Sequence, residues 1–446
     1  MRLPVLRRRG RRSGLATLDC VSGAAIIDDL LARGLIQDHT DLDALRERLG
    51  RGPMTLYVGF DPSADSLHVG SLVPLLLLRR FQLAGHLPIV LAGGATGMVG
   101  DPGGRSEERN LLDSETLDRN TRAIKAQLSA FLDFEPGPCQ ARLVDNRDWT
   151  APIGVLDFLR DVGKHMTVNY MLAKESVRSR VASEHGISFT EFSYMLLQAN
   201  DYSWLYEHMN CELQAGGSDQ WGNITAGIDL TRRRNGASVH GLTVPLVTRS
   251  DGEKFGKSVE GALWLDPERT SPYALYQYFV NLPDSDVERY LLQLTLVPVE
   301  EARRVAAEHA RAPERRAGQV RLAWEMCALI HGAEAADEAA AASTGFTSAA
   351  GSLSAEQLAA LTDEIPTTHA EIAGRDVVDL LVESKLAASK GEARRLIAGG
   401  GIYVNDVALA ESRALGSDDL LHDRYVMLRK GKRQRHLLVA NSKRAL

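Results

Sequence analysis

The sequence of 446 residues predicts an α/β protein: a doubly wound parallel sheet, followed by an α-helical unit and a small α+β unit. From Met54 onward, short apolar runs alternate with amphipathic stretches, as in parallel strands joined by helices. Glycine and polar residues cluster after several of these runs, where sheets of this kind bind their ligands. Beyond Pro272 helical periods take over, and short strands return only near the C-terminus.

The expected elements follow in chain order. Strands are expected where short apolar runs are bounded by turn residues, at residues 56–60, 88–92, 141–144, 212–215 and 239–247. The apolar run at residues 72–83 is expected to form a helix. Further helices are expected at residues 273–281, 299–310 and 314–330.

The composition excludes several classes of protein. Hydrophobic residues make up 44% and charged residues 25%, which is typical of globular proteins and not of disordered, collagenous or coiled-coil chains. The longest apolar run, residues 72–78, is shorter than the roughly 18 residues of a membrane span, so no membrane segment is expected. The cysteines, Cys20, Cys139, Cys211 and Cys327, form no C-x-x-C pair. We therefore expect neither a disulfide framework nor a zinc ribbon, and a reducing, cytoplasmic location.

The chain is expected to divide into five segments. Residues 1–22 are expected to be a disordered basic extension, since the first 18 residues contain six arginines and no acid; alternatively, the true start is at Val21. Residues 333–351 are rich in small residues, which favours a loosely structured linker. The other segments are a sheet domain at 23–270, a helical domain at 271–332, the linker at 333–374 and a C-terminal domain at 375–446.

Charge is distributed unevenly along the chain. The net charge is -6, but residues 376–446 contain 13 Lys/Arg and 9 Asp/Glu, a difference of +4. A basic C-terminal end on an acidic body favours a nucleic-acid contact at that end.

The first block of chemical interest is His68-Val-Gly70-Ser71, directly ahead of the expected helix at 72–83. These residues fall in the first turn of that helix, whose free N–H groups and positive dipole end attract an anion. Gly70 lets a ligand approach the backbone closely because it has no Cβ. A His-x-Gly triplet alone is more often an ordinary capped helix with a surface histidine.

The second block is the glycine-rich stretch at residues 93–104, with Asp101 inside it. Many glycines after a strand indicate backbone close to a ligand, and the lone carboxylate suits a cationic group. A dinucleotide-binding loop is the rival interpretation. The glycines do not fit G-x-G-x-x-G, and no acidic residue ends a second strand about 20 positions later.

The third block is Tyr194-x-x-x-Gln198-x-x-Asp201, whose spacing places three polar side chains on one face of a helix. A polar stripe is usually a solvated face. Here both flanking sides are apolar, so the stripe is expected to line a buried pocket.

The fourth block, Gly216-Gly217-Ser218-Asp219-Gln220, again joins a strand end to a helix. Ser218 or Asp219 alone fits a simple N-cap. That interpretation leaves the paired glycines and Gln220 unexplained.

The fifth block, Gly252-Glu-Lys254-Phe-Gly256-Lys257-Ser258, nearly matches a P-loop, but only three residues separate its two glycines where a P-loop has four. Two lysines on a glycine-containing loop suit a clamp that brings positive charge to a polyphosphate. A solvated basic turn is the simpler alternative.

The C-terminal segment carries two basic elements. Ser389 and Glu392 form a capping box, and the helix that it opens places basic residues on neighbouring positions of one face. A hairpin turn supplies the second element. The candidate RNA-binding residues are Lys390, Arg394, Arg395, Lys430, Lys432 and Arg433.

Together these blocks resemble bacterial tyrosyl-tRNA synthetases, which are class I aminoacyl-tRNA synthetases, over residues 24–446. His68-Val-Gly70-Ser71 resembles the class I "HIGH" signature, and the fifth block resembles "KMSKS". The resemblance implies a Rossmann-like catalytic domain at 23–270, an anticodon-side helical domain at 271–332, and an RNA-binding domain like that of a ribosomal small-subunit protein at 375–446. The last position of "HIGH" is Ser71 rather than His, so weaker nucleotide contacts are expected there.

The resemblance also implies an activity: tyrosine reacts with ATP to give tyrosyl-adenylate and pyrophosphate, and is then transferred to the 3′-terminal adenosine of tRNA(Tyr). The implied catalytic residues are Ser63, His68, Lys254, Lys257 and Ser258. The implied tyrosine-binding residues are Tyr57, Asp101, Tyr194, Gln198, Asp201 and Gln220. The implied ATP-binding residues are Gly59, Asp61, His68, Gly70, Ser71, Gly217, Asp219 and Lys257, with Arg105 and Arg109 on the pyrophosphate side. Magnesium is expected to travel with ATP, no tightly bound metal is expected in the protein, and the resemblance implies a homodimer.

Three alternatives stay open at this point. A nucleotidyltransferase with an H-x-G-H site shares the first block but needs neither the Tyr194, Gln198 and Asp201 stripe nor an RNA-binding end. A non-catalytic RNA-binding paralogue would keep the fold without the reaction. A tryptophanyl synthetase is the nearest catalytic relative, and the pair Tyr57 and Asp201 disfavours it.

Overall fold

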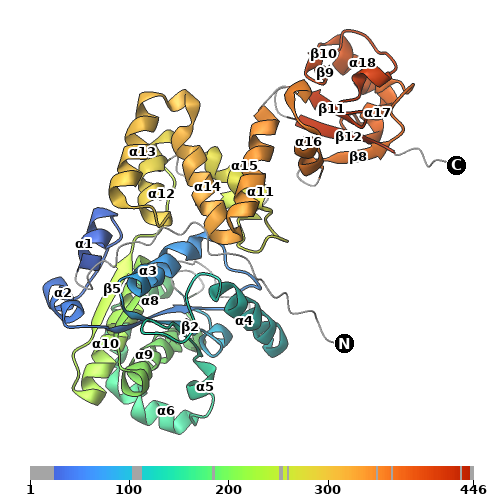
Figure 1. The fold of residues 1–446 in the computed structure, drawn as a ribbon. Coiled ribbons are helices and arrows are strands. Elements are labelled where there is room, and N and C mark those ends of the chain that lie inside the picture. Colours follow the sequence, from blue (N-terminus) through green and yellow to red (C-terminus); the bar gives the residue numbers. More distant parts are fainter. Residues whose placement is uncertain are drawn as a thin grey trace. The chain divides into compact units, whose positions relative to one another are not determined.

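A computed structural model describes residues 25–102, 113–182, 186–250, 255–258, 261–347, 350–362, 365–431 and 434–441 (Figure 1). The described residues form two compact units: those up to Asp266 together with 288–304, and those of 267–287 together with the ones from Val305 onward. Each unit contains a five-stranded sheet.

Five parallel strands form the sheet of the first unit, in the order β3-β2-β1-β4-β5. They are β1 (Thr55–Phe60), β2 (Leu87–Ala92), β3 (Arg142–Asp145), β4 (Cys211–Gly217) and β5 (His240–Val244). The strand order reverses at β1, so the carboxyl end of β1 is the switch point at which such sheets bind ligands. The predicted parallel sheet is confirmed. The last strand ends at Val244, earlier than predicted, because Pro245 has no N–H to donate.

Helices and two short strands surround this sheet. The helix α3 is almost entirely buried, as its apolar sequence requires, and packs on β1 and β2, while α9 and α10 lie side by side and pack on β4. The helices are α1 (Ala25–Ala32), α2 (Leu42–Gly50), α3 (Leu72–Leu83), α4 (Ser114–Leu128), α5 (Arg147–Thr150), α6 (Val155–Asp161), α7 (Val168–Leu172), α8 (Glu175–Val181), α9 (Phe189–Met209), α10 (Trp221–Asn235) and α12 (Val287–Leu294). The short strands β6 (Lys257–Ser258) and β7 (Gly261–Ala262) pair with each other.

The segment between α1 and α2 covers the outer edge of β5. The backbone N–H of Gln37 donates to the carbonyl of Thr243 at 2.8 Å, and the N–H of Thr243 donates to the carbonyl of Asp38 at 2.7 Å. An uncovered edge would offer unpaired backbone groups to other chains, so this segment closes one side of the sheet.

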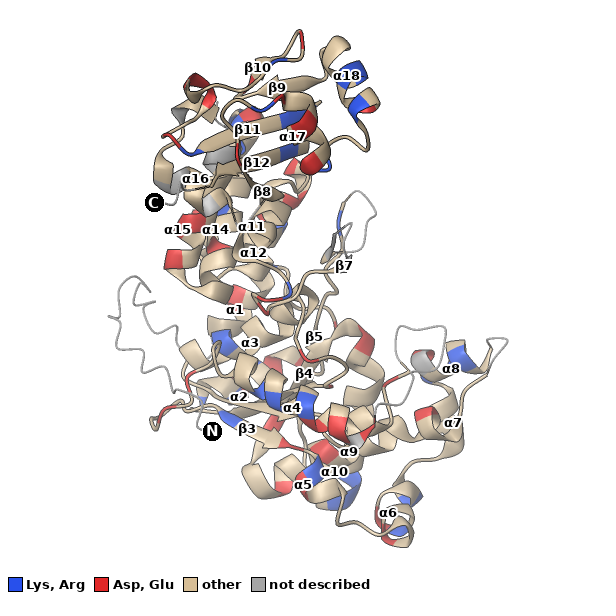
Figure 2. Ribbon diagram, turned by 90° about the vertical axis from the view of Figure 1, so that its right-hand side faces the viewer, with Lys and Arg blue, Asp and Glu red and all other residues tan. Residues whose placement is uncertain are grey.

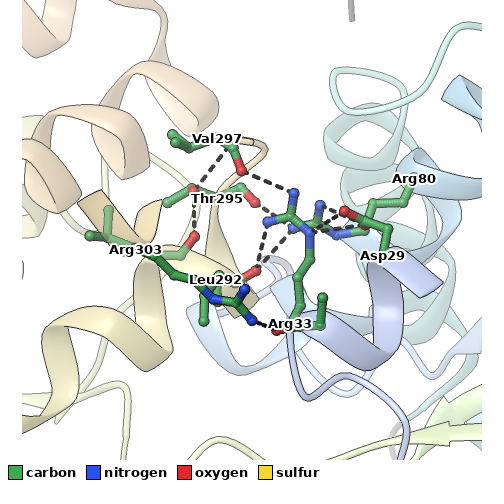
Figure 3. A network of polar contacts seen from close by, with 9 residues as sticks. Asp29, Arg33, Arg80, Leu292, Thr295, Val297 and Arg303 are labelled. Atoms are coloured by element: carbon green, nitrogen blue, oxygen red, sulfur yellow. Dashed lines mark hydrogen bonds and ion pairs between the residues drawn. The ribbon is translucent and has the colours of Figure 1, made fainter. Parts of the chain in front are cut away.

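Two buried arginines anchor the far end of α3 to the end of α12 (Figure 3). Arg80, in the last turn of α3, and Arg33, just after α1, both donate to backbone carbonyls, and Arg33 also pairs with Asp29 at 2.9 Å. The accepting carbonyls belong to Leu292, Thr295 and Val297. Burial, reinforced by the charge of Arg33, lowers the pKa of Arg80 to about 9. Carbonyls at a helix end carry partial negative charge, which explains why two guanidinium groups are tolerated beside a single carboxylate.

The second unit combines helices with a five-stranded sheet in the order β10-β9-β11-β12-β8. Neighbouring strands are antiparallel, except that β8 runs parallel to β12. The strands are β8 (Thr367–Ala370), β9 (Ile402–Val404), β10 (Val407–Ala408), β11 (Tyr425–Lys430) and β12 (Gln434–Ala440). The helices are α11 (Pro272–Val280), α14 (Ala317–His331), α15 (Ala333–Thr347), α16 (Ala355–Leu361), α17 (Val377–Glu383) and α18 (Lys390–Ala398), and α13 (Val299–Arg311) is divided between the two units at Val305.

The prediction of a loosely structured linker at residues 333–374 is wrong. This stretch contains α15, α16 and β8, and Leu353, Leu358 and Leu361 share a core with Met427 and Leu437 of the sheet. The alanine-rich composition suggested a linker, but alanine has the highest helix propensity and the leucines supply the buried face. The stretch is therefore part of the second unit.

Among the described residues, every helix is too short or too polar to cross a lipid bilayer.

Candidate active site

A cavity of about 310 Å³ opens at the carboxyl ends of β1 and β4, at the switch point of the sheet. It collects side chains from four of the five sequence blocks. Its lining includes Tyr57, Gly59, Asp61, Ser63, Gly70, Ser71, Asp101, Tyr194, Gln198, Asp201, Gly217, Asp219 and Gln220. The structure thus brings together predicted site residues that lie up to 163 positions apart, from Tyr57 to Gln220.

The floor of the cavity is formed by Tyr57 on β1 and Asp201 on α9, which are 1% and 2% exposed. The hydroxyl of Tyr57 has no hydrogen-bond partner among the described residues. Burial, and then the charge of Asp201, raises the pKa of Tyr57 well above its usual value, so the hydroxyl keeps its proton. A buried donor without a partner is costly, and this one faces a cavity that a ligand can fill.

Asp201 is held by two donors from the segment that follows β3. The indole Nε1 of Trp149 donates to Oδ1 at 2.8 Å, and Nδ2 of Asn146 donates to Oδ2 at 2.9 Å. Burial raises the pKa of Asp201 to about 7, although these two hydrogen bonds oppose the shift. Neither Trp149 nor Asn146 is among the residues that the sequence predicts for this site. The signal was the position of Asn146 directly after a parallel strand, at the ligand-binding edge of the sheet.

Amide and carboxylate side chains line one wall. Nε2 of Gln220 donates to Oδ2 of Asp101 at 2.6 Å and Nε2 of Gln198 donates to Oε1 of Gln220 at 3.2 Å. Nδ2 of Asn223, which is likewise absent from the predicted site residues, donates to Oε1 of Gln198 at 3.0 Å. Lys, Arg and His are absent from the described residues that line the cavity, whereas four aspartates line it. The wall therefore favours a cationic group.

A second carboxylate, Asp61, lies just beyond β1. Its Oδ2 accepts a hydrogen bond from the hydroxyl of Tyr194 at 2.9 Å, and its Oδ1 accepts one from Oγ1 of Thr96 at 2.8 Å. Burial, and then the charge of Asp61, raises the pKa of Tyr194 well above its usual value. Tyr194 therefore stays protonated and donates to Asp61, which leaves the lone pairs of its oxygen for another donor.

The turn at residues 68–71 forms the mouth of the cavity. His68 is the N-cap of a 3₁₀ turn (Val69–Ser71) that leads into α3, and its Nδ1 accepts a hydrogen bond from the N–H of Gly70 at 3.0 Å. Burial lowers the pKa of His68, so the ring is neutral at pH 7 and carries its proton on Nε2. His68 itself does not line the cavity, whereas Gly70 and Ser71 do.

The β6–β7 hairpin lies directly against this turn. The N–H of Val69 donates to the carbonyl of Leu263 at 3.0 Å, and the N–H of Leu263 donates to the carbonyl of Gly256 at 2.8 Å. The ring of Trp264 meets His68 edge-on, with centroids 6.4 Å apart. The backbone of Lys257 and Ser258 thus runs beside the histidine turn. Lys254, Arg105 and Arg109 lie outside the described residues.

Asp219 and its neighbours occupy the start of α10. A Cβ on Gly217 would lie 2.6 Å from Oδ1 of Asp219, so a larger residue at this position would require the carboxylate to shift. Burial, opposed by a hydrogen bond from Gln220, raises the pKa of Asp219. Asp219 and Ser218 cap no helix with their side chains, because the N-cap position of α10 is Gln220 and makes no side-chain capping bond.

The basic residues of the C-terminal end gather on α18 and the end of β11, and much of α18 is blue in Figure 2. Nζ of Lys430 binds Glu392 on α18 at 3.1 Å, which joins the two elements. Lys390 pairs with Asp379 at 2.7 Å, and Arg394 and Arg395 are exposed. Lys432 and Arg433 lie outside the described residues.

Comparisons with known proteins agree along almost the whole chain. Residues 49–348 match the family "tRNA synthetases class I (W and Y)", and residues 357–438 match "Tyrosine--tRNA ligase SYY-like C-terminal domain". The chain is 56% identical to a tyrosine--tRNA ligase of Opitutus terrae over 415 residues, which is 92% of this chain and 98% of that protein. It is 52% identical to a tyrosine--tRNA ligase of Mycobacterium tuberculosis over 413 residues, covering 92% of this chain and 97% of that protein.

A solved structure is similar as well. The C-terminally truncated mitochondrial tyrosyl-tRNA synthetase of Aspergillus nidulans matches with a TM-score of 0.66 at 32% identity, covering 72% of this chain and 94% of that one. With such identity over nearly the full length of its relatives, the chain belongs to the class I tRNA synthetases and, among them, to the tyrosine--tRNA ligases.

Proposed function

We propose that the cavity at the end of β1 is the site at which this tyrosine--tRNA ligase activates tyrosine. The ligase reaction begins with attack of the tyrosine carboxylate on the α-phosphate of ATP, which gives tyrosyl-adenylate and pyrophosphate. The nucleophile is already ionised, so the step needs no general base. The protein must align the reactants and stabilise the charge that builds on the phosphates. Tyrosine then passes to the 3′-terminal adenosine of tRNA(Tyr).

The phenol end of tyrosine would lie between Tyr57 and Asp201. One donor already occupies each oxygen of Asp201, and each oxygen has a second lone pair to offer. The phenol would donate to Asp201 and accept from the hydroxyl of Tyr57. The observation that carries this assignment is the buried Tyr57 hydroxyl, which has no partner among the described residues.

The ammonium end would lie against the wall of Asp101, Gln198 and Gln220, with Tyr194 as a further acceptor. Supporting this, Tyr194 lines the cavity and its hydroxyl donates its proton to Asp61, so its oxygen can only accept from a ligand. The absence of basic side chains from the described lining removes any competing positive charge. A cation held by carboxylate, amide and phenol oxygens is stabilised by charge-assisted hydrogen bonds.

ATP would occupy the mouth of the cavity. The glycines bring backbone close to the nucleotide, and His68, protonated on Nε2, can donate to a phosphate oxygen. The proposed ATP contacts are Gly59, Asp61, Ser63, His68, Gly70, Ser71, Gly217 and Asp219. Lys254, Lys257 and Ser258 would close on the pyrophosphate, with positive charge from the two lysines and a hydrogen bond from the serine, and Arg105 and Arg109 would assist there. Mg²⁺ would arrive on the phosphates of ATP, because it sheds its waters reluctantly and prefers phosphate oxygens.

The segments are proposed to divide the labour. Residues 23–270 would activate tyrosine, residues 271–332 would face the anticodon side of the tRNA, and residues 375–446 would bind RNA. In support of the last role, Arg394 and Arg395 are exposed on α18 and Lys430 is tied to the same helix. A reducing cytoplasm is the proposed location, because the scattered cysteines of the sequence form no C-x-x-C pair.

A homodimer is proposed from the apolar outer faces of α6, α7 and the ends of α8 and α9. Val155, Leu156 and Phe189 are 75%, 81% and 76% exposed. Leu159, Val168, Leu172 and Val181 are further exposed apolar residues of this group. Monomeric proteins rarely expose so many large apolar side chains close together. Such a patch is typical of an interface between two copies of a chain. We expect light scattering to give a dimer and Leu156→Asp a monomer; a dimer unaffected by that change would place the interface elsewhere.

The decisive experiment is ATP/pyrophosphate exchange with each of the twenty amino acids. We expect exchange with tyrosine and almost none with the other nineteen. Exchange that needs no amino acid would favour a nucleotidyltransferase, and no exchange at all would favour a non-catalytic RNA-binding protein. Loss of tyrosine-dependent exchange in Asp201→Ala, with the fold retained, would link the activity to this cavity.

A further inference from the structure

A continuous chain of hydrogen bonds runs beneath the cavity from one end to the other. Nδ2 of Asn146 donates to Asp201 at 2.9 Å and to Oγ1 of Thr96 at 3.0 Å. Oγ1 of Thr96 donates to Asp61 at 2.8 Å, and Asp61 accepts from the hydroxyl of Tyr194 at 2.9 Å. Thr96 is the middle member of this chain, and it lines the cavity while being 3% exposed.

The direction of each hydrogen bond is fixed. The backbone N–H of Ala95 donates to Oδ1 of Asn146 at 2.7 Å, so the NH₂ group of that amide must face Thr96 and Asp201. The oxygen of Thr96 accepts from this NH₂ group, and its single proton therefore goes to Asp61. Between the carboxylates of Asp201 and Asp61 the chain therefore consists of a neutral amide and one hydroxyl, and beyond Asp61 it ends at the hydroxyl of Tyr194.

The backbone is shaped to allow the contact between Thr96 and Asp61. A Cβ on Gly93 would lie 2.5 Å from Oγ1 of Thr96 and would also overlap Oδ1 of Asp61. Glycine at the end of β2 thus makes room for this hydrogen bond. Asn146 is fully buried, and a hydrogen bond in a region of low dielectric constant is stronger than one in water.

We propose that Thr96 is a positioning residue that couples the phenol-binding end of the site to the ammonium-binding end. Its hydroxyl holds Asn146 against Asp201 on one side and holds Asp61, and through it Tyr194, on the other. The inference rests on the proposed roles of Asp201 and Tyr194. It adds that neither end keeps its geometry when this one hydroxyl is removed.

The test uses the full chain with Thr96→Val, which removes the hydroxyl at nearly constant volume, and Thr96→Ser, which keeps it. ATP/pyrophosphate exchange is measured with tyrosine and, at high enzyme concentration, with phenylalanine. In Thr96→Val we expect kcat/KM for tyrosine to fall about 10- to 100-fold, as for loss of a hydrogen bond to a charged group. Phenylalanine has no hydroxyl and depends only on the ammonium end of the site, so its kcat/KM should fall less. The ratio of kcat/KM for tyrosine to kcat/KM for phenylalanine should therefore decrease. Thr96→Ser should restore both values.

Thr231→Val serves as the matched control, because Thr231 is fully buried and its hydroxyl binds the carbonyl of Gly227 within α10, away from the cavity lining. It should leave the substrate ratio unchanged. If a thermal scan shows that Thr96→Val does not fold, Thr96→Ala is used in its place, because it removes the same hydroxyl without placing a methyl group beside Asp61.

Each remaining outcome overturns the coupling. Equal losses of kcat/KM for the two substrates would mean that Thr96 positions only the ammonium-binding end, which both substrates use. Unchanged kcat/KM values would mean that Thr96 positions neither end. A different variant tests the proposed phenol-binding site itself. If that site is wrong, Asp201→Ala keeps its preference for tyrosine over phenylalanine, whatever the effect of Thr96→Val.

Discussion

Gly256 of the β6–β7 hairpin packs directly on Val69 of the histidine turn: a Cβ at Gly256 would lie 2.6 Å from Cγ2 of Val69. Gly256 also has a φ of +74°, a backbone angle that residues other than glycine adopt only with strain. The two signature segments of the chain are therefore in contact through a residue that must be glycine. Substitution at this position should separate them.

Gly256→Ala is expected to lower the rate of tyrosine-dependent pyrophosphate exchange about 10- to 100-fold, because the backbone that carries Lys257 must move away from the turn. Gly236→Ala is the matched control, since Gly236 has a φ of +65° at the end of α10 and nothing within 4 Å of its missing Cβ. Both variants should lose on the order of 1 kcal/mol of stability. An equal effect of the two on exchange would show that strain, and not the contact with Val69, is responsible.

Tyr57→Phe should change stability and activity in opposite directions. The hydroxyl that it removes is buried without a partner among the described residues, so the free protein should be no less stable, or slightly more stable. Binding of tyrosine loses a hydrogen bond, and kcat/KM should fall at least about tenfold. Tyr202→Phe provides the contrast: its hydroxyl donates to the carbonyl of His240 at 2.7 Å and its ring lies behind Tyr57 at 5.5 Å. It should lower the melting temperature and leave selectivity intact, and the reverse pattern would contradict the proposed phenol site.

The sequence predicted those features of the fold and the site that depend only on residues close together in the chain. The apolar runs predicted the five strands, and the spacing of Tyr194, Gln198 and Asp201 predicted a shared helix face that the structure places along one cavity. Asn146 and Thr96 were missed because their importance depends on which strands are neighbours. They follow β3 and β2, and only the pairing of those two strands brings them together. The linker prediction at residues 333–374 failed for a different reason. An alanine-rich helix has the composition of a linker, and the sequence does not show that the leucines after it are buried against a sheet formed later in the chain.

Charge reversal on α18 should separate the two steps of the reaction. We expect the double substitution Arg394→Glu and Arg395→Glu to leave pyrophosphate exchange unchanged, because neither residue contributes to the described cavity. Charging of tRNA should weaken by about tenfold or more, and the salt dependence of charging should become shallower, since fewer phosphates are neutralised. Arg51→Glu, a charge reversal at an exposed position of the first unit, should affect neither step. Equal losses in exchange and charging would argue against a separate RNA-binding role for α18.

The ionisation of Asp201 should make stability depend on pH in a specific sense. Burial raises its pKa from 3.8 to about 7 in the folded protein, whereas in the unfolded chain the carboxyl is exposed. Between pH 4 and pH 7 the folded state therefore holds a proton that the unfolded state has released. Stability from this group is greatest below about pH 4 and decreases as the pH rises toward 7, because stability falls with pH wherever the folded state binds more protons.

Asp201→Asn removes this ionisation while keeping a side chain of the same shape, so its melting temperature should rise relative to that of the wild type as the pH increases. The gain between pH 5 and pH 8 should correspond to a few kcal/mol at most, since each pKa unit is worth about 1.4 kcal/mol. Asp219→Asn is the control, because the carboxyl of Asp219 is only partly buried and should give a smaller change. Thermal scans of the three proteins at four pH values suffice. A melting-temperature difference between Asp201→Asn and wild type that stays constant with pH would show that Asp201 is ionised throughout the range, and that tyrosine meets a carboxylate at the floor of the cavity even below neutral pH.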